Sequence, residues 1–170
     1  ITATNNITAT TITATTAFVP DASDGAALGT SALEFSDLFL ADGAAISFGD
    51  DNEITLTHVA DDGLVLKHVG TGDGKEPSLT FQAGDDDIAI NDVLGSIFFQ
   101  APDEGAGTDA VAIAAGIEAV AEGDFSSSSN ATSLVFKTGA SEAATAKVKI
   151  TSAGHLVPNA DDTYDLGTGS

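Results

Sequence analysis

The sequence predicts an all-β protein with a thin, extended, fibrous structure of short strands and hairpins, whose core is shared between identical chains. Several short segments alternate apolar or β-branched residues with polar ones, which is the period-2 pattern of a strand with one buried face. Turn-forming runs of Asp, Asn and Gly separate these segments. Bulky side chains are scarce, with nine Phe, one Tyr and no Trp in 170 residues. One copy would therefore bury little apolar surface by itself.

The first 17 residues form a low-complexity segment. The sequence ITAT occurs at Ile1–Thr4, Ile7–Thr10 and Ile12–Thr15. Alternation of Ile or Ala with Thr is typical of strands, because β-branched residues favour extended backbone. Two interpretations remain open for residues 1–17: a fibrous β-spacer wound with partner chains, or a low-complexity spacer.

Residues 18–94 are predicted to form a hairpin-rich module. It starts with a turn-rich loop over Asp21–Gly29, and alternation then predicts a strand through Ile46 and Phe48. Two alternating segments on either side of a short Asp-Gly turn predict a β-hairpin. The expected elements are a turn at Gly49–Asn52, a strand through Ile54, Leu56 and His58, the Asp61–Gly63 turn, a strand over Leu64–Val69, a polar loop over Gly70–Pro77, and strands at Ser78–Gln82 and Ile88–Ile90 around Gly84–Asp87.

Residues 95–156 are predicted to form a second β module. Gly95–Gln100 is an apolar strand, and Leu134–Lys137 with Lys147–Ile150 is a hairpin. Ala110–Glu122 is Ala-rich and could form a short helix. However, its apolar residues recur at every second position and a Gly weakens a helix interior, so a long strand is favoured. A polar loop over Gly123–Thr132 follows.

Residues 157–170 repeat residues 19–32. Seven of the fourteen positions are identical at a constant offset of 138 residues, with no gap. An ungapped repeat indicates that one structural unit is used twice. The first copy continues into Leu33–Leu38, and the second ends at Ser170 before any counterpart of those apolar residues. We therefore expect the natural chain to continue past Ser170.

Charge excludes several classes of partner. Twenty-six acidic residues outnumber five lysines, and the formal net charge is −21. Binding to nucleic acid requires clustered basic residues, and anionic membrane surfaces repel an acidic protein, so neither is an expected partner. Cysteine is absent, which excludes disulfides and thiolate chemistry.

Histidines and aspartates are the candidate metal ligands. His58 and His68 lie on the two strands of the predicted hairpin and could face one another as a metal-binding pair, but polar outward-facing or interface strand residues are the favoured interpretation. His155 follows Gly154 in a predicted turn and has no visible partner. Asp is preferred in turns for its local hydrogen bonds. The acidic clusters at Asp50-Asp51, Asp61-Asp62, Asp85–Asp87 and Asp161-Asp162 all fall in predicted turns and lack the ligand spacing of known calcium loops. Solvated turns are the favoured interpretation, with a calcium site as the alternative.

No catalytic arrangement is found in the sequence. Gly70–Lys75 is Gly-rich, but its spacing does not fit a phosphate-binding loop and Pro77 follows it. Ser126–Ser129 lacks a nucleophile elbow with matching His and Asp residues. We therefore expect a protein that is not an enzyme, with no catalytic, cofactor-binding or metal-binding residues and no cofactor; receptor-binding residues are not assigned.

Five short segments form a recognisable set of motifs. They are Asp51–Val59 followed by Asp62–Leu66, Gly95–Phe99 with its Gly-x-Ile-x-Phe pattern, Leu134–Thr138, Lys149–Leu156, and the Leu-Gly-Thr unit of Val157–Ser170. Taken together, these segments resemble the repeat-bearing shafts of bacteriophage tail fibres and related virion fibre proteins, especially those of marine phages. The resemblance covers most of Phe18–Ser170, although Lys149 stands where those fibres usually have Arg.

The resemblance implies a parallel homotrimer in an extracellular virion fibre. It predicts a structural segment that spaces or presents a host-binding tip for adsorption. The expected partners are identical chains, neighbouring virion proteins, and a glycan or protein of the host cell surface. Two alternatives remain: a bacterial surface adhesin or extracellular filament subunit, and, with less support, a polysaccharide-degrading tailspike module.

Overall fold

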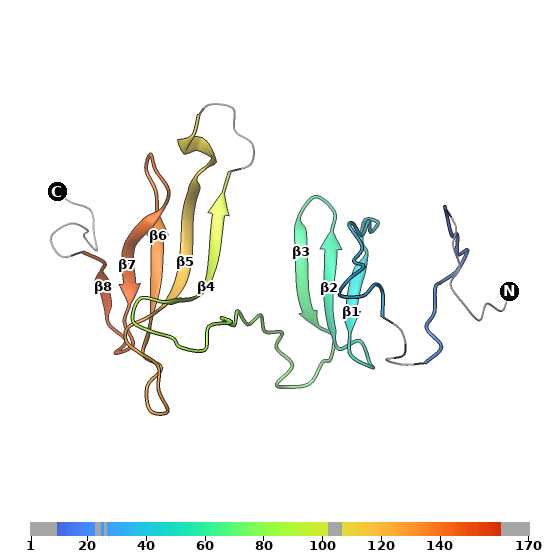
Figure 1. The fold of residues 1–170 in the computed structure, drawn as a ribbon, viewed down its shortest axis with the longest axis horizontal. Helices are drawn as coiled ribbons and strands as arrows, with labels where there is room; N and C mark the ends of the chain where they lie inside the picture. Colours follow the sequence, from blue (N-terminus) through green and yellow to red (C-terminus); the bar gives the residue numbers. More distant parts are fainter. Residues whose placement is uncertain (1–9, 23–24, 26, 102–106, 161–170) are drawn as a thin grey trace. The chain divides into compact units, whose positions relative to one another are not determined.

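The fold is all-β, as predicted. The structure, a computed structural model, describes residues 10–22, 25, 27–101 and 107–160. In these residues it contains two antiparallel sheets, one of three strands and one of five, and its only helical element is the short 3-10 turn η1 (Asp109–Val111) (Figure 1). The chain divides into two compact units, Ile1–Pro77 and Ser78–Ser170. Each unit contains one of the sheets.

The three-stranded sheet has the order β1-β2-β3 and confirms the predicted hairpin. Its strands are β1 (Ala45–Phe48), β2 (Ile54–Val59) and β3 (Gly63–His68). The Gly49–Asn52 turn is closed by a hydrogen bond from the Asn52 amide to the Gly49 carbonyl. Asp61 adopts a left-handed conformation at φ 62° in the turn between β2 and β3. Asp tolerates this conformation better than most residues, which is why it suits the turn.

The five-stranded sheet is a meander with the order β4-β5-β6-β7-β8. Its strands pair in sequence order, so each connection joins neighbouring antiparallel strands (Figure 1). The predicted strand at Gly95–Gln100 and the hairpin of Leu134–Lys137 with Lys147–Ile150 are confirmed. The strands are β4 (Val93–Gln100), β5 (Ile113–Ala121), β6 (Thr132–Thr138), β7 (Thr145–Ile150) and β8 (Leu156–Pro158).

Ala110–Glu122 forms a strand over most of its length. β5 pairs with β4 on one side and β6 on the other. Its alternating residues therefore divide between the two faces of the sheet, as period-2 alternation requires. Only the first residues of the segment differ, because Asp109–Val111 forms the turn η1.

The predictions of strands at Ser78–Gln82 and Ile88–Ile90 are wrong. Neither segment pairs with a strand. Phe81 instead packs against the sheet at Gly95, where a Cβ would lie 2.6 Å from the Phe81 Cβ. Around Ile88, the backbone turns: the Ala89 amide donates to the Asp92 carboxylate, and the Asp92 amide donates to the Ala89 carbonyl. The apolar residues of both segments therefore lie in loops and not in strands.

The ITAT segment and the two repeat copies lie partly outside the described residues. Residues 10–17 form no strand within the single chain, and residues 1–9 lie outside the described part. Both interpretations of residues 1–17 stay predictions. The start of the second repeat, Val157-Pro158, lies in β8, whereas Val19-Pro20 of the first copy lies in no strand. The remainder of the second copy, from Asp161 on, is not described.

The core of one chain is small. Among the described residues, the buried hydrophobic side chains are Ala121, Val135 and Ala144, all of modest size. No large side chain is fully buried. Most large apolar residues, including seven phenylalanines, are exposed. The sheets are therefore held by backbone pairing and half-buried side chains, with no closed interior.

Candidate functional site: an apolar sheet face

The most distinctive surface of the second unit is one face of the five-stranded sheet. Directly paired residues of antiparallel strands point to the same side. The register pairs Ile97 with Ile117, Ile117 with Phe136, and Phe136 with Val148. We call this the apolar face; it comprises Gly95, Ile97, Phe99, Ala115, Ile117, Ala119, Leu134, Phe136, Val148, Ile150 and Leu156.

The apolar face carries no charged side chain and is largely open to solvent. Ile97 is 46% exposed, Phe99 55% and Leu156 53%. Phe81 reaches this face from the segment before β4 and lies over Gly95, but is itself half exposed. Exposed apolar patches of this kind mark interaction surfaces in folded proteins.

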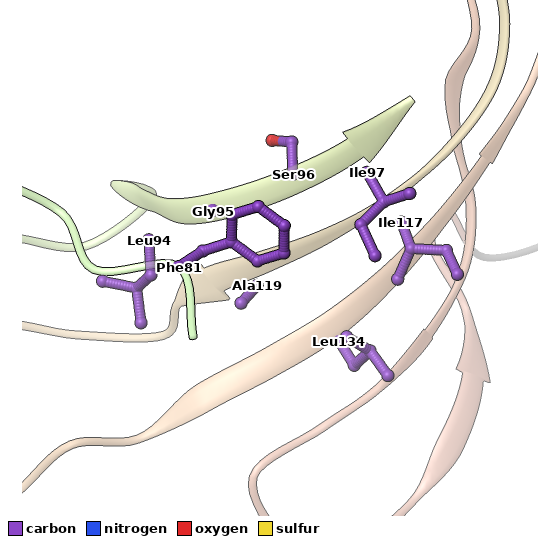
Figure 2. A pocket seen from close by; sticks show the side chains of 8 residues that line it. All are labelled: Phe81, Leu94, Gly95, Ser96, Ile97, Ile117, Ala119 and Leu134. Atoms are coloured by element: carbon purple, nitrogen blue, oxygen red, sulfur yellow. The ribbon is translucent and has the colours of Figure 1, made fainter. Parts of the chain in front are cut away.

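A shallow hollow of about 270 Å³ lies on this face. Figure 2 shows Phe81, Ile97, Ile117 and Leu134 around it, with the small side chain of Ala119 between them. Ser96 borders the hollow, but its hydroxyl points to the other side of β4 (Figure 2). The hollow is therefore lined by hydrocarbon and offers no side-chain hydrogen bond, which suits an apolar side chain.

The opposite face of the same sheet carries the charges. Lys137 Nζ lies 2.9 Å from Glu118 Oε1, and the two side chains are only 22% and 12% exposed. The same ammonium group lies 5.8 Å from the centre of the Phe98 ring, within cation–π range. Val135 and Ser133 on this face are buried. The charged groups of Glu118 and Lys137 thus pair within one copy, and two residues of this face are buried without a partner chain.

The three-stranded sheet repeats this division of faces. Its register places Ile46 opposite Leu56 and Leu56 opposite Leu66 on one side. The other side carries Ser47, Thr55 and Thr57. The apolar side holds a hollow of about 200 Å³ that is bordered by Leu40, Ile46, Leu56 and Leu64. Each unit taken by itself therefore leaves one apolar sheet face uncovered.

The structure does not bring the three histidines together. His58 pairs with Leu64, and His68 pairs with Ile54 four residues away on β2, which separates the two imidazoles' strand positions by about 13 Å. The two histidines therefore do not face one another, and the less favoured interpretation, a metal-binding pair, does not match the register. His58 Nδ1 lies 3.7 Å from Asp42, and His68 Nδ1 accepts a hydrogen bond from the Gly70 amide. His155 lies exposed in the β7–β8 turn, in the other unit.

The acidic clusters that the structure describes lie in turns. The Asp87 amide donates to the Asp85 carboxylate, a local turn bond. A hydrogen bond with the Glu53 side chain lowers the pKa of Asp51. Among the described residues, no three His, Asp or Glu side chains are placed to hold a metal ion. Asp161-Asp162 lies outside them.

Neither the serine run nor the Gly-rich loop forms a catalytic arrangement in the described structure. The Ser126 hydroxyl accepts a bond from the Ser128 amide within a tight turn closed by Ser126 and Ser129. Gly70–Pro77 is an irregular loop, and no helix begins at its end. A phosphate-binding loop requires that helix, because its amides and dipole hold the phosphate.

Sequence reasoning missed the side chains that shape both faces of the larger sheet. Phe81 was assigned to a strand, and neither Gly95 nor the Glu118–Lys137 pair was singled out. The alternation of β4, β5 and β6 places Ile97, Ile117 and Leu134 on one face once the register is known. The sequence shows that each strand has one apolar side. It does not show which residues pair across strands, because the register depends on turns and bulges.

Comparisons with known proteins add no relative. No family model matches the chain, and neither the curated proteins nor the solved structures contain a match. The described residues also include no helix with the length and hydropathy that a bilayer crossing requires.

Proposed function

We propose that this chain is a structural segment of an extracellular virion fibre, a phage tail fibre that spaces or presents a host-binding tip. Identical chains form a parallel homotrimer, in which short strands and hairpins of three copies share an elongated core. Neighbouring virion proteins and a host surface glycan or protein are its further partners. The segment itself has no catalytic role.

One observation carries the proposal: each sheet leaves an apolar face open, while a single chain buries only three hydrophobic side chains among its described residues. A chain with so little core gains stability by association, since binding of further copies favours the folded state. The motif resemblance points to the same kind of assembly. The net charge of −21 keeps such a fibre soluble.

Mass measurement tests the assembly. Multi-angle light scattering of the purified chain should give about three times the 16.9 kDa of one copy. A folded protein that stays at the single-chain mass at micromolar concentration would contradict the proposal.

Location is tested on the source particle. An antibody raised against the chain should label fibres that project from a virion in negative-stain electron micrographs. Labelling of cell-surface filaments would instead support an adhesin. Release of reducing ends from host polysaccharide by the purified chain would contradict the non-catalytic role.

A further inference from the structure

We infer that the apolar face of the five-stranded sheet is the surface through which copies of this chain contact one another. The inference rests on the proposed function, because it names the contact surface of the proposed assembly. It assigns Ile97, Ile117 and Leu134 to the interior between copies, and Glu118 and Lys137 to the outside.

The exposed side chains of the apolar face are spread across the sheet. Ile97 and Phe99 of β4, Leu134 of β6, Ile150 of β7 and Leu156 of β8 are each between 38% and 55% exposed. A stable interface removes about 800 Å² from each partner, and a contact of that size needs apolar side chains from several strands, which this face provides.

Charge selects this face over the opposite face of the same sheet. Two copies that each carry a net charge of −21 repel one another wherever their acidic residues meet. The strand residues of the apolar face are all uncharged, so contact there brings no like charges together. The opposite face holds Glu118 and Lys137, which already neutralise each other within one copy.

The chemistry of the hollow also favours a second copy over a glycan. Sugars present hydroxyl groups that need hydrogen-bond partners when they are buried. The side chains around the hollow are hydrocarbon, and the Ser96 hydroxyl points away from it (Figure 2). An apolar side chain from the same face of another copy satisfies this surface, because the small side chain of Ala119 leaves room for it.

The test uses adjacent positions on opposite faces of β4 in a chain that has no cysteine. Single Ile97→Cys and Ser96→Cys variants are treated with a maleimide. In one copy Ile97 is the more exposed of the two residues, so an unassembled chain labels faster at position 97. In the proposed assembly the order reverses, and labelling at position 97 slows by an order of magnitude or more. In denaturant both thiols react at the same rate.

Two single lysine variants at the same positions provide the second measurement. Ile97→Lys and Ser96→Lys change the net charge equally. Ile97→Lys should reduce the light-scattering mass to that of one chain, while Ser96→Lys, beside Glu118, should keep the assembly. If Ile97→Lys loses its β-sheet circular dichroism, the variant has unfolded and its mass is not informative. The labelling of the two cysteine variants then tests the inference, because Cys is neutral and smaller than Ile and is therefore better tolerated at position 97.

The outcomes separate the two proposals. A single-chain mass for the unmodified protein overturns both. A trimer that labels rapidly at position 97 and survives Ile97→Lys overturns this inference and leaves the proposed function standing. Protection at position 97 in a protein of single-chain mass means that the chain covers the face by itself, which also overturns the inference.

Discussion

Phe81 lies over Gly95 so closely that a Cβ at position 95 would come within 2.6 Å of the Phe81 Cβ. The segment before β4 is thereby held against the apolar face, and glycine at this position permits the contact. A side chain at position 95 would therefore have to displace Phe81 or the strand.

Gly95→Ala should destabilise the second unit by about 1–3 kcal/mol, because the added methyl group overpacks against Phe81. Urea denaturation followed by circular dichroism measures the change. Gly123→Ala is the matched control, since nothing lies within 4 Å of a Cβ there. Adding Phe81→Gly, which removes the Phe81 Cβ, to Gly95→Ala should remove most of the overlap cost; a loss that is the simple sum of the two single substitutions would contradict the contact.

Lys137→Ala should cost about 1–3 kcal/mol, because it leaves the mostly buried carboxylate of Glu118 without its charged hydrogen-bond partner. A Lys137→Met/Glu118→Leu double variant should be more stable than Lys137→Ala, because it leaves no unpaired charge. Lys67→Ala, on an exposed position of β3, is the control and should change stability by no more than about 0.5 kcal/mol. Equal small effects at positions 67 and 137 would argue against the pair.

Glu122 links the end of β5 to the β7–β8 turn and makes stability depend on pH. Its carboxylate accepts hydrogen bonds from the Ser152 hydroxyl and amide, and chiefly the hydroxyl bond lowers the pKa of Glu122. Because the folded-state pKa lies below the ordinary value of 4.5, the ionised carboxylate stabilises the folded protein above that pH. This contribution is lost as the pH falls through the lowered folded-state pKa.

Ser152→Ala should therefore destabilise the protein at neutral pH, and the difference from the unmodified protein should vanish in acid. Urea midpoints measured across the acidic range test this. Ser141→Ala is the control, because that hydroxyl bonds the adjacent Glu142 within an exposed loop. A gap for Ser152→Ala that is constant with pH would show that the hydroxyl acts independently of the Glu122 charge.

Gly49→Ala should weaken the three-stranded sheet more than Gly43→Ala does. Both glycines have positive φ, 86° and 74°, so alanine at either position costs about 1 kcal/mol in backbone strain. At Gly49 the new Cβ would also overlap the Glu53 carboxylate, whereas nothing lies within 4 Å at Gly43. Hydrogen exchange of the β2 amides measures the loss, and Glu53→Ala should reduce the excess at position 49. Equal losses at both glycines would contradict the overlap.

The sequence by itself determined the class of fold and most strands. Alternation at Ile54, Leu56 and His58, and again through β5, favours a strand with two different faces. Asp and Gly at the turns then mark where each strand ends. These are local properties, so they are visible without knowledge of the partners.

Tertiary structure decided which residues meet. Phe81 looks like a strand residue in the sequence, but Ser78–Gln82 pairs with no strand, and the Phe81 side chain lies over Gly95 instead. The separation of His58 from His68 and the pairing of Glu118 with Lys137 both follow from register, which turn length and bulges set. A shift of one residue would exchange the two faces of a strand. The position of the apolar face therefore depends on the register of the whole sheet, which no single segment of sequence contains.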